Sequence, residues 1–308
     1  MNLPFAPDAL IRQLAWPTEP VDMVLDTDTY NEIDDQFALV YALLSPERMT
    51  MKAVYAAPFH NSRSSGPADG MEKSYEEILR LLDFMDRSAD GFAFRGSTEW
   101  LANHDTPVRS EAVEHLIELA RSYTEDRPLY VVAIGAITNV ASALIAAPDI
   151  ARKIVVLWLG GHPVHCGSTN EFNLQGDRIA SRFIFDCGVP LVRFPCALVA
   201  QSLASTNAEM ERFAKGRGQI GDYLYEIFST YKPDMDEPGV SKVVWDIAPI
   251  AWLVQENGIS SCLMPSPILN VADLTFSVDY GRHYLREVVH INRDVVYKDL
   301  FTKLAKLS

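Results

Sequence analysis

The sequence predicts an α/β fold, a doubly wound and mostly parallel sheet with helices on both faces, extended by extra C-terminal helices and strands. Through the first two thirds of the chain, short apolar runs alternate with amphipathic helical patterns. These runs are continuous, which is typical of strands covered on both faces. No repeat with a period of about 20–50 residues recurs, so the sequence excludes a solenoid or a propeller.

The order of elements follows from these patterns. We expect strands over residues 21–27, 52–57, 91–95, 129–134, 153–159 and 190–194, and helices over residues 33–44, 71–85, 110–122, 138–147 and 177–187. The first helix places apolar residues 33, 37, 40, 41 and 44 on one stripe. Pro148 stops the helix over 138–147, because proline cannot continue a helical hydrogen-bond ladder.

After about residue 200 the regular alternation ends. We expect helices over residues 207–215, 219–231 and 246–255, strands over 266–271 and 283–291, and a last helix from residue 294. Residues 232–240 form a polar stretch that contains proline. No linker rich in glycine, serine or proline divides the chain, so we expect one domain over residues 1–308.

The composition excludes several classes of partner. Lys and Arg number 27 against 41 Asp and Glu, a formal net charge of −14, which disfavours nucleic acids and anionic membranes. No apolar stretch is long enough to span a membrane, and no basic segment followed by an apolar run predicts a secretory signal. The four cysteines show no metal-binding spacing, so we expect free thiols in a reducing cytoplasm.

Five carboxylates follow the first expected strand within ten residues. They are Asp26, Asp28, Glu32, Asp34 and Asp35. Ligands of α/β sheets bind at the carboxyl ends of strands, and crowded carboxylates repel one another unless a cation compensates them. The cluster therefore predicts a site for a hard divalent cation, calcium or magnesium, although a solvated acidic loop would also give this pattern. Asn31 is the expected N-cap of the helix that follows.

Other phosphate and cation motifs fit less well. An EF-hand that opened at Asp26 would need Gly and Glu where Asn31 and Phe37 stand, and no Walker loop is present. The run VLDTDT also resembles the motif of haloacid-dehalogenase-type phosphatases, which would use Asp26 and Asp28 with magnesium. The later acidic pair of that family has only Asp177 as a match. This phosphatase alternative stays open.

Two later patches also carry polar side chains. Glu171 and Asn173 flank Phe172 after a strand, an arrangement that suits sugar hydroxyls and an apolar sugar face, although a plain surface loop would look the same. Asp246 follows Trp245 at the start of an expected helix, where capping is the simpler role.

Together these segments resemble the inosine–uridine-preferring nucleoside hydrolase family over most of the chain. The matches are the DxDxxxDD-like residues 26–35, GAITN at 135–139, EFN at 171–173 and the Trp-Asp pair at 245–246, all in the family order. The resemblance implies a hydrolase that splits the N-glycosidic bond of ribonucleosides into free base and ribose. A calcium-dependent ribose-binding protein without turnover is the alternative from another class.

The resemblance also implies residue roles. Calcium would be held by Asp28, Asp35, Asp246 and the backbone carbonyl of Ile134, with Asp28 as general base on a calcium-bound water. Such a metal-anchored acidic pocket would stabilise the positive charge that develops on ribose.

The substrate side would be formed by further residues of the motifs. Asp34 and Asn173 would bind the 2′-hydroxyl side, Asp246 the 3′-hydroxyl and Glu171 the 5′-hydroxyl, with Phe172 lining the pocket. Family members form dimers or tetramers, so a homo-oligomer is implied.

The chain departs from the family pattern in three places. Five residues separate Asp28 from Asp34, two more than in the family motif. Trp245 stands where the family has a histidine that is proposed to protonate the leaving base. His165 stands near the position of a family asparagine at the 5′-hydroxyl.

Other side chains are candidates for the missing roles. His60, His162 or His165 would have to supply a proton, and Asn61 is a candidate ribose contact. Tyr223, Tyr225 and Tyr231 lie in a late helical segment that is expected to cover the site or to pack in the core.

Overall fold

A central sheet of eight strands organises the structure, a computed structural model that describes residues 6–307. The strand order is β3-β2-β1-β4-β5-β6-β12-β9. The strands are β1 (Val21–Thr27), β2 (Met49–Ala56), β3 (Ala93–Arg95), β4 (Leu129–Ala133), β5 (Ile154–Leu159), β6 (Leu191–Phe194), β9 (Ile259–Pro265) and β12 (Tyr284–Ile291). All neighbours pair in parallel except β9, which runs antiparallel to β12 at the edge.

Helices cover both faces of this sheet, which confirms the doubly wound α/β prediction. Alternate residues of β1 show the division: Met23 and Leu25 pack into one buried cluster and Val24 into the other. The first cluster includes α2 (Asp35–Leu43), α3 (Pro67–Phe84), α10 (Ile247–Val254) and α11 (Arg293–Leu304), and the second includes α4 (Glu111–Arg121), α5 (Thr138–Ala146) and α7 (Arg178–Asp186).

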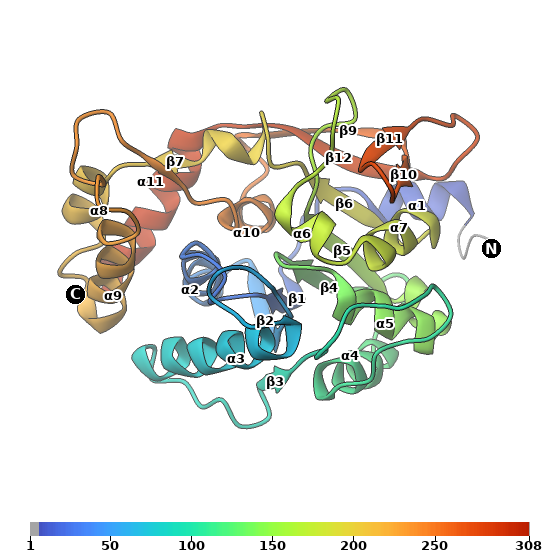
Figure 1. Cartoon of the computed structure of the whole chain (residues 1–308), viewed down its shortest axis with the longest axis horizontal. Helices are drawn as coiled ribbons and strands as arrows, with labels where there is room; N and C mark the ends of the chain where they lie inside the picture. Colours follow the sequence, from blue (N-terminus) through green and yellow to red (C-terminus); the bar gives the residue numbers. More distant parts are fainter. Residues whose placement is uncertain (1–5, 308) are drawn as a thin grey trace.

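The remaining elements are short or lie at the rim. They are α1 (Pro7–Gln13), α6 (Phe172–Gly176), α8 (Asn207–Phe213), α9 (Gly218–Ser229), the paired strands β7 (Ala204–Ser205) and β8 (Lys242–Val243), and the hairpin β10 (Ile268–Asn270) with β11 (Thr275–Ser277). The 3-10 turns are Pro148–Arg152, Ala200–Ser202 and Ala305–Leu307. Figure 1 shows α8, α9 and α11 gathered at the opposite end of the molecule from α4, α5 and α7.

Parallel register brings the site segments to one edge. Asp26 pairs with Ala133 across β1 and β4, so the residues that follow these strands leave the sheet side by side. The ends of β5 and β6 adjoin them at Leu159 and Phe194. The carboxyl ends of four neighbouring strands therefore meet at one place, where ligands of α/β sheets bind.

Several element predictions need correction. The helix expected from residue 33 begins at Asp35, with Asp34 rather than Asn31 at its N-cap position. The strand expected over 266–271 is only the short β10, and both α1 and β9 were not predicted. β9 has a mixed polar sequence and no clear alternation, and its strand form depends on antiparallel pairing with β12.

Two other expectations concern the whole chain. All four cysteines are free thiols, as predicted. Among residues 6–307, no helix is sufficiently long and apolar to cross a bilayer.

Candidate active site

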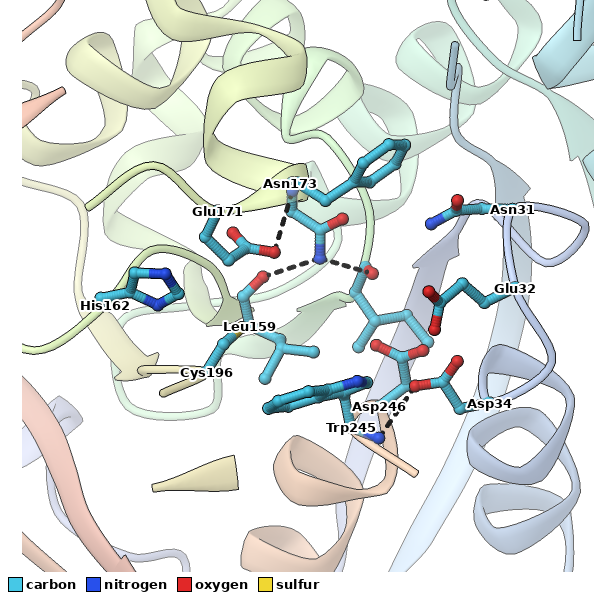
Figure 2. A pocket seen from close by; sticks show the side chains of 12 residues that line it. Asn31, Glu32, Asp34, Leu159, His162, Glu171, Asn173, Cys196, Trp245 and Asp246 are labelled. Atoms are coloured by element: carbon cyan, nitrogen blue, oxygen red, sulfur yellow. Dashed lines mark hydrogen bonds between the residues drawn. The ribbon is translucent and has the colours of Figure 1, made fainter. Parts of the chain in front are cut away.

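A cavity of about 280 Å³ opens at the carboxyl edge of the sheet. Its wall comes from the β1–α2 loop, the ends of β4 and β5, α6, the segment after β6 and the β8–α10 junction. The lining residues are Asn31, Glu32, Asp34, Ile134, Leu159, His162, Glu171, Phe172, Asn173, Cys196, Trp245 and Asp246 (Figure 2). Three segments that the sequence singled out separately thus share one cavity.

An acidic cluster borders this cavity, and two of its members, Asp34 and Asp246, line the wall. Carboxylate oxygens of Asp34, Asp35 and Asp246 lie within 4.8 Å of one another, and all three residues are buried. Asp34 stands at the N-cap position of α2 and Asp246 at that of α10, and neither side chain caps its own helix. Two helix N-termini therefore converge on the cluster, and their partial positive charges favour anions there.

Asp28 lies beside this cluster and has no partner of its own. It is 1% exposed, and neither carboxylate oxygen has a hydrogen-bond partner. Gly135 allows this close packing, because a Cβ at that position would lie 3.1 Å from the Asp28 Cγ. A buried carboxylate without a partner is costly, so the arrangement fits a cation bound among these side chains.

Burial and mutual repulsion perturb the acids of the cluster. Burial, followed by repulsion from Asp35 and Asp34, raises the pKa of Asp28 well above its usual range. Burial and the neighbouring Asp34 raise the pKa of Asp35 to about 7, and burial followed by Asp34 and Asp35 raises the pKa of Asp246. Oxygen ligands held close together in this way are the donor set that calcium and magnesium prefer, and a bound cation would reverse these shifts.

Lys242 is a site residue that the sequence did not reveal. Its buried ammonium lies 2.6 Å from Glu32 Oε2 and 3.5 Å from Asp34 Oδ1, and it donates to the Val243 carbonyl oxygen at 2.7 Å. The Tyr231 hydroxyl donates to the other oxygen of Glu32 at 3.0 Å. A lone lysine in an apolar stretch gives no pattern, so only the fold identifies it.

Glu171 and Asn173 are held by backbone groups. Glu171 caps α6 and accepts from the backbone N–H groups of Asn173, Leu174 and Gly161 at 3.0, 3.1 and 2.8 Å. The Asn173 amide nitrogen donates to the carbonyl oxygens of Ile134 and Leu159 at 2.9 and 3.0 Å. The Ile134 carbonyl keeps a second lone pair, so it is still able to bind a cation.

The rest of the wall is less polar. The Trp245 backbone N–H donates to Asp34 Oδ2 at 2.8 Å, which ties the β8–α10 junction to the acidic cluster. His162 accepts a hydrogen bond at Nδ1 from the Ala197 backbone N–H at 3.3 Å. Figure 2 shows His162 with Glu171 and Cys196, across the cavity from Asn31 and Glu32.

Comparison with known proteins identifies the family. The model of the inosine-uridine preferring nucleoside hydrolases matches residues 23–296. The chain belongs to this family. It is 25% identical over 231 residues to the Probable uridine nucleosidase 2 of Arabidopsis thaliana, covering 68% of this chain and 69% of that protein. It is also 25% identical over 261 residues to the Non-specific ribonucleoside hydrolase RihC of Salmonella agona (strain SL483), covering 77% and 80%.

Solved structures show the same fold. The Purine-Preferring Ribonucleoside Hydrolase from Gardnerella vaginalis superposes with a TM-score of 0.72 at 19% identity, covering 93% of this chain and 98% of that one. Because the chain belongs to the nucleoside hydrolase family and its relatives are ribonucleoside hydrolases, this protein is a hydrolase that acts on N-glycosidic bonds. The family is metal-dependent, and the acidic triad of this chain is able to bind a metal.

The family motifs divide into cavity residues and structural residues. In GAITN, Gly135 packs against Asp28, and Thr138 donates to Asp177 at 2.9 Å. Asn139 donates to Asp26 Oδ1 at 2.7 Å and accepts from the Ser97 backbone N–H at 2.7 Å. Asp26 is buried and its carboxylate is held by Asn139, and with the family established the phosphatase alternative is excluded.

Two predicted substrate contacts lie outside the cavity wall. Asn61 donates to the carbonyl and side-chain oxygens of Asn31 at 3.3 and 2.7 Å, so it supports the β1–α2 loop. His165 is exposed in the loop before α6. His60 is likewise exposed. The sequence placed all three near strand ends, but strand position alone does not set which way a loop side chain points.

The three tyrosines that were expected to cover the site or pack in the core make different contacts. Only Tyr231 reaches a cavity residue, through Glu32. Tyr223 donates to Glu77 on α3, and Tyr225 lies under the Lys215 ammonium. The longer loop after Asp28 is thus tied to the segment that follows α9 through Glu32.

Proposed function

We propose that this family member is a calcium-dependent ribonucleoside hydrolase whose cavity binds ribose against the acidic cluster. The observation that carries the proposal is the buried Asp28 carboxylate, which has two unpartnered oxygens next to Asp34, Asp35 and Asp246. Calcium takes oxygen ligands in flexible geometry, and Asp28, Asp35, Asp246 and the Ile134 carbonyl supply them. When bound, the cation would lower the pKa of water and orient it.

The chain's own residues would then perform the remaining steps. Asp28 would accept the proton of the attacking water. Asp34 and Asn173 would hold the 2′-hydroxyl side of ribose, and Asp246 the 3′-hydroxyl. Glu171 would bind the 5′-hydroxyl at the other end of the cavity. Positive charge develops on ribose as the C1′–N bond breaks, and these fixed carboxylates would stabilise it.

The names of the relatives indicate a substrate class but no single base. The proteins with related sequence or fold are named as uridine, non-specific and purine-preferring hydrolases, so both purine and pyrimidine ribonucleosides are candidate substrates.

We further propose that residues 1–308 act as one domain and that the protein is a cytoplasmic dimer or tetramer. Light scattering after size exclusion measures the assembly.

A nucleoside panel tests the activity. We expect ribose release with calcium, loss of release after chelation and its return when calcium is added back. Asp28→Asn should reduce turnover by at least about a hundredfold, the lower range for loss of a general base. Full activity of Asp28→Asn, or full activity in chelator, would contradict the mechanism.

A binding measurement separates the enzyme from a ribose-binding protein. Calorimetry should detect one calcium per chain at this site and ribose binding that depends on calcium. Ribose binding without turnover of any nucleoside would favour the binding protein instead.

A further inference from the structure

The cavity wall combines aromatic and acidic side chains, among them Trp245, Phe172, Asn31 and Glu32. Under the proposed function the base would leave beside Trp245, because this residue stands at the position of the family's histidine. Purine and pyrimidine bases depart as anions unless the enzyme protonates them, and a positioned acid is the usual device. The indole of Trp245 does not titrate in the physiological range, so it cannot act as that acid.

Neighbouring groups do not replace the missing acid. Both carboxylate oxygens of Glu32 already accept hydrogen bonds, one from Tyr231 and one from Lys242. The Lys242 ammonium is itself held by Glu32, by Asp34 and by the Val243 carbonyl. The Tyr231 hydroxyl and the Lys242 ammonium therefore direct their hydrogen bonds to these acceptors and not into the cavity.

The remaining lining groups lie at the other end. His162 and the Cys196 thiol stand beside Glu171, the end proposed for the 5′-hydroxyl, across the cavity from Glu32 (Figure 2). Apart from His162, Cys196 and the aliphatic Ile134 and Leu159, the described side chains that line the cavity are aromatic rings, amides and carboxylates. Such a wall favours a flat cationic ring, through cation–π attraction and charge complementarity.

We propose that the preferred substrate class is an N-ribosylpyridinium cation, whose ring leaves without being protonated. This inference rests on the proposed ribonucleoside hydrolase function. The C1′–N bond breaks with both electrons going to the ring nitrogen, which becomes a neutral pyridine. The oxygen of water bonds to C1′, and its proton passes to Asp28 and then to solvent. The products are ribose, the neutral pyridine and one proton.

A comparison of leaving groups tests the inference. Nicotinamide riboside supplies the cationic ring, and inosine and uridine supply bases that need protonation. 4-Nitrophenyl β-D-riboside is an uncharged substrate whose aglycone leaves as the stable 4-nitrophenolate anion, so it needs no acid. We expect kcat/KM for nicotinamide riboside to exceed that for inosine and uridine at least tenfold, and to exceed that for the nitrophenyl riboside.

Each other result has a definite meaning. Inosine or uridine turned over as fast as nicotinamide riboside overturns the inference and leaves the proposed function standing. A faster nitrophenyl riboside overturns the preference for a cation. No turnover of any of the four substrates overturns the proposed function, and the inference with it.

Variants at one position show whether Trp245 sets the preference. Trp245→His should raise inosine turnover and give its kcat/KM profile a new pH limb near the histidine pKa of about 6.5, while nicotinamide riboside turnover falls. Trp245→Phe keeps an aromatic ring and should keep the substrate ratio. An unchanged ratio in a folded Trp245→His protein would overturn the assignment.

Discussion

The Lys242 ammonium lies 2.6 Å from Glu32 Oε2, which joins a loop after the first strand to a strand about two hundred residues later in the chain. The lysine side chain is buried, and the glutamate faces the cavity. Burial opposes the ion pair, but Lys242, Tyr231 and Arg63 together hold the pKa of Glu32 below its usual value. The pair therefore carries charge at neutral pH and fixes the longer loop over the site.

Removing this ammonium should destabilise the protein. Lys242→Met leaves Asp34 buried without its cation and Glu32 without its main partner, so we expect the free energy of unfolding to fall by about 2–4 kcal/mol. Urea unfolding in chelator measures it. In the double variant Lys242→Met with Glu32→Gln, part of the loss should return, because one of the two stranded charges is gone. Additive losses would show that the pair is not coupled.

The stability of the metal-free protein should decrease as pH rises. Burial raises the pKa of Asp35 from 3.8 to about 7 in the folded state. Between these values the unfolded chain loses its proton while the folded chain keeps it, so the free energy of unfolding falls over this window. We expect a higher Tm in chelator at about pH 5 than at about pH 8.

Two controls isolate the acidic cluster. Asp35→Asn should flatten part of this pH dependence, because an amide does not titrate. Calcium at about a hundred times its Kd should raise the free energy of unfolding of the wild-type protein by about 2.7 kcal/mol at about pH 8. If the stability of Asp35→Asn depended on pH as strongly as that of the wild type, the dependence would come from groups other than Asp35.

Gly161 should be sensitive to a single added methyl group. Its φ is +72°, and a Cβ would lie 2.5 Å from Thr169 Oγ1 and 2.8 Å from Leu174 Cδ1. Since its N–H also holds Glu171, Gly161→Ala should lower stability by about 1–3 kcal/mol and raise KM for ribosides. Gly167→Ala in the same loop meets nothing within 4 Å and should be near neutral in both assays. Equal effects of the two substitutions would contradict this account.

Asn139 should contribute to stability and not to catalysis. Its side chain binds Asp26, the Ser97 backbone N–H and the Ala56 carbonyl, at 2.7, 2.7 and 3.3 Å. Asn139→Ala leaves these buried groups unpaired, and we expect a loss of about 2–4 kcal/mol by thermal or urea unfolding. Ser142→Ala on the same helix removes one acceptor, for Val108, and should cost about 1 kcal/mol. In the folded fraction of Asn139→Ala, kcat should stay near wild type.

Much of the sheet could be predicted from local pattern, and the exceptions share a cause. Strands such as Ile154–Leu159 are uniformly apolar because helices cover both faces, and this pattern is visible in sequence. β9 lacks it, since an edge strand is stabilised mainly by its pairing with β12. Asn31 was a reasonable N-cap by residue type, but its side-chain oxygen accepts from Asn61 instead.

The sequence by itself determined which acids follow the expected strands, because apolar runs and side-chain types are local properties. Asp28, Asp34, Asp35 and Glu171 were identified as candidate site residues in this way, and Asp246 was identified at the start of an expected helix. Only the tertiary structure decided what surrounds them. Packing between distant segments brings four further residues to the site or its wall: Lys242, Tyr231, His162 and Cys196. Asn61 and His165 stay outside the cavity wall. The physical reason is that a loop side chain takes its partner from whichever segment packs against it, and no local spacing encodes that contact.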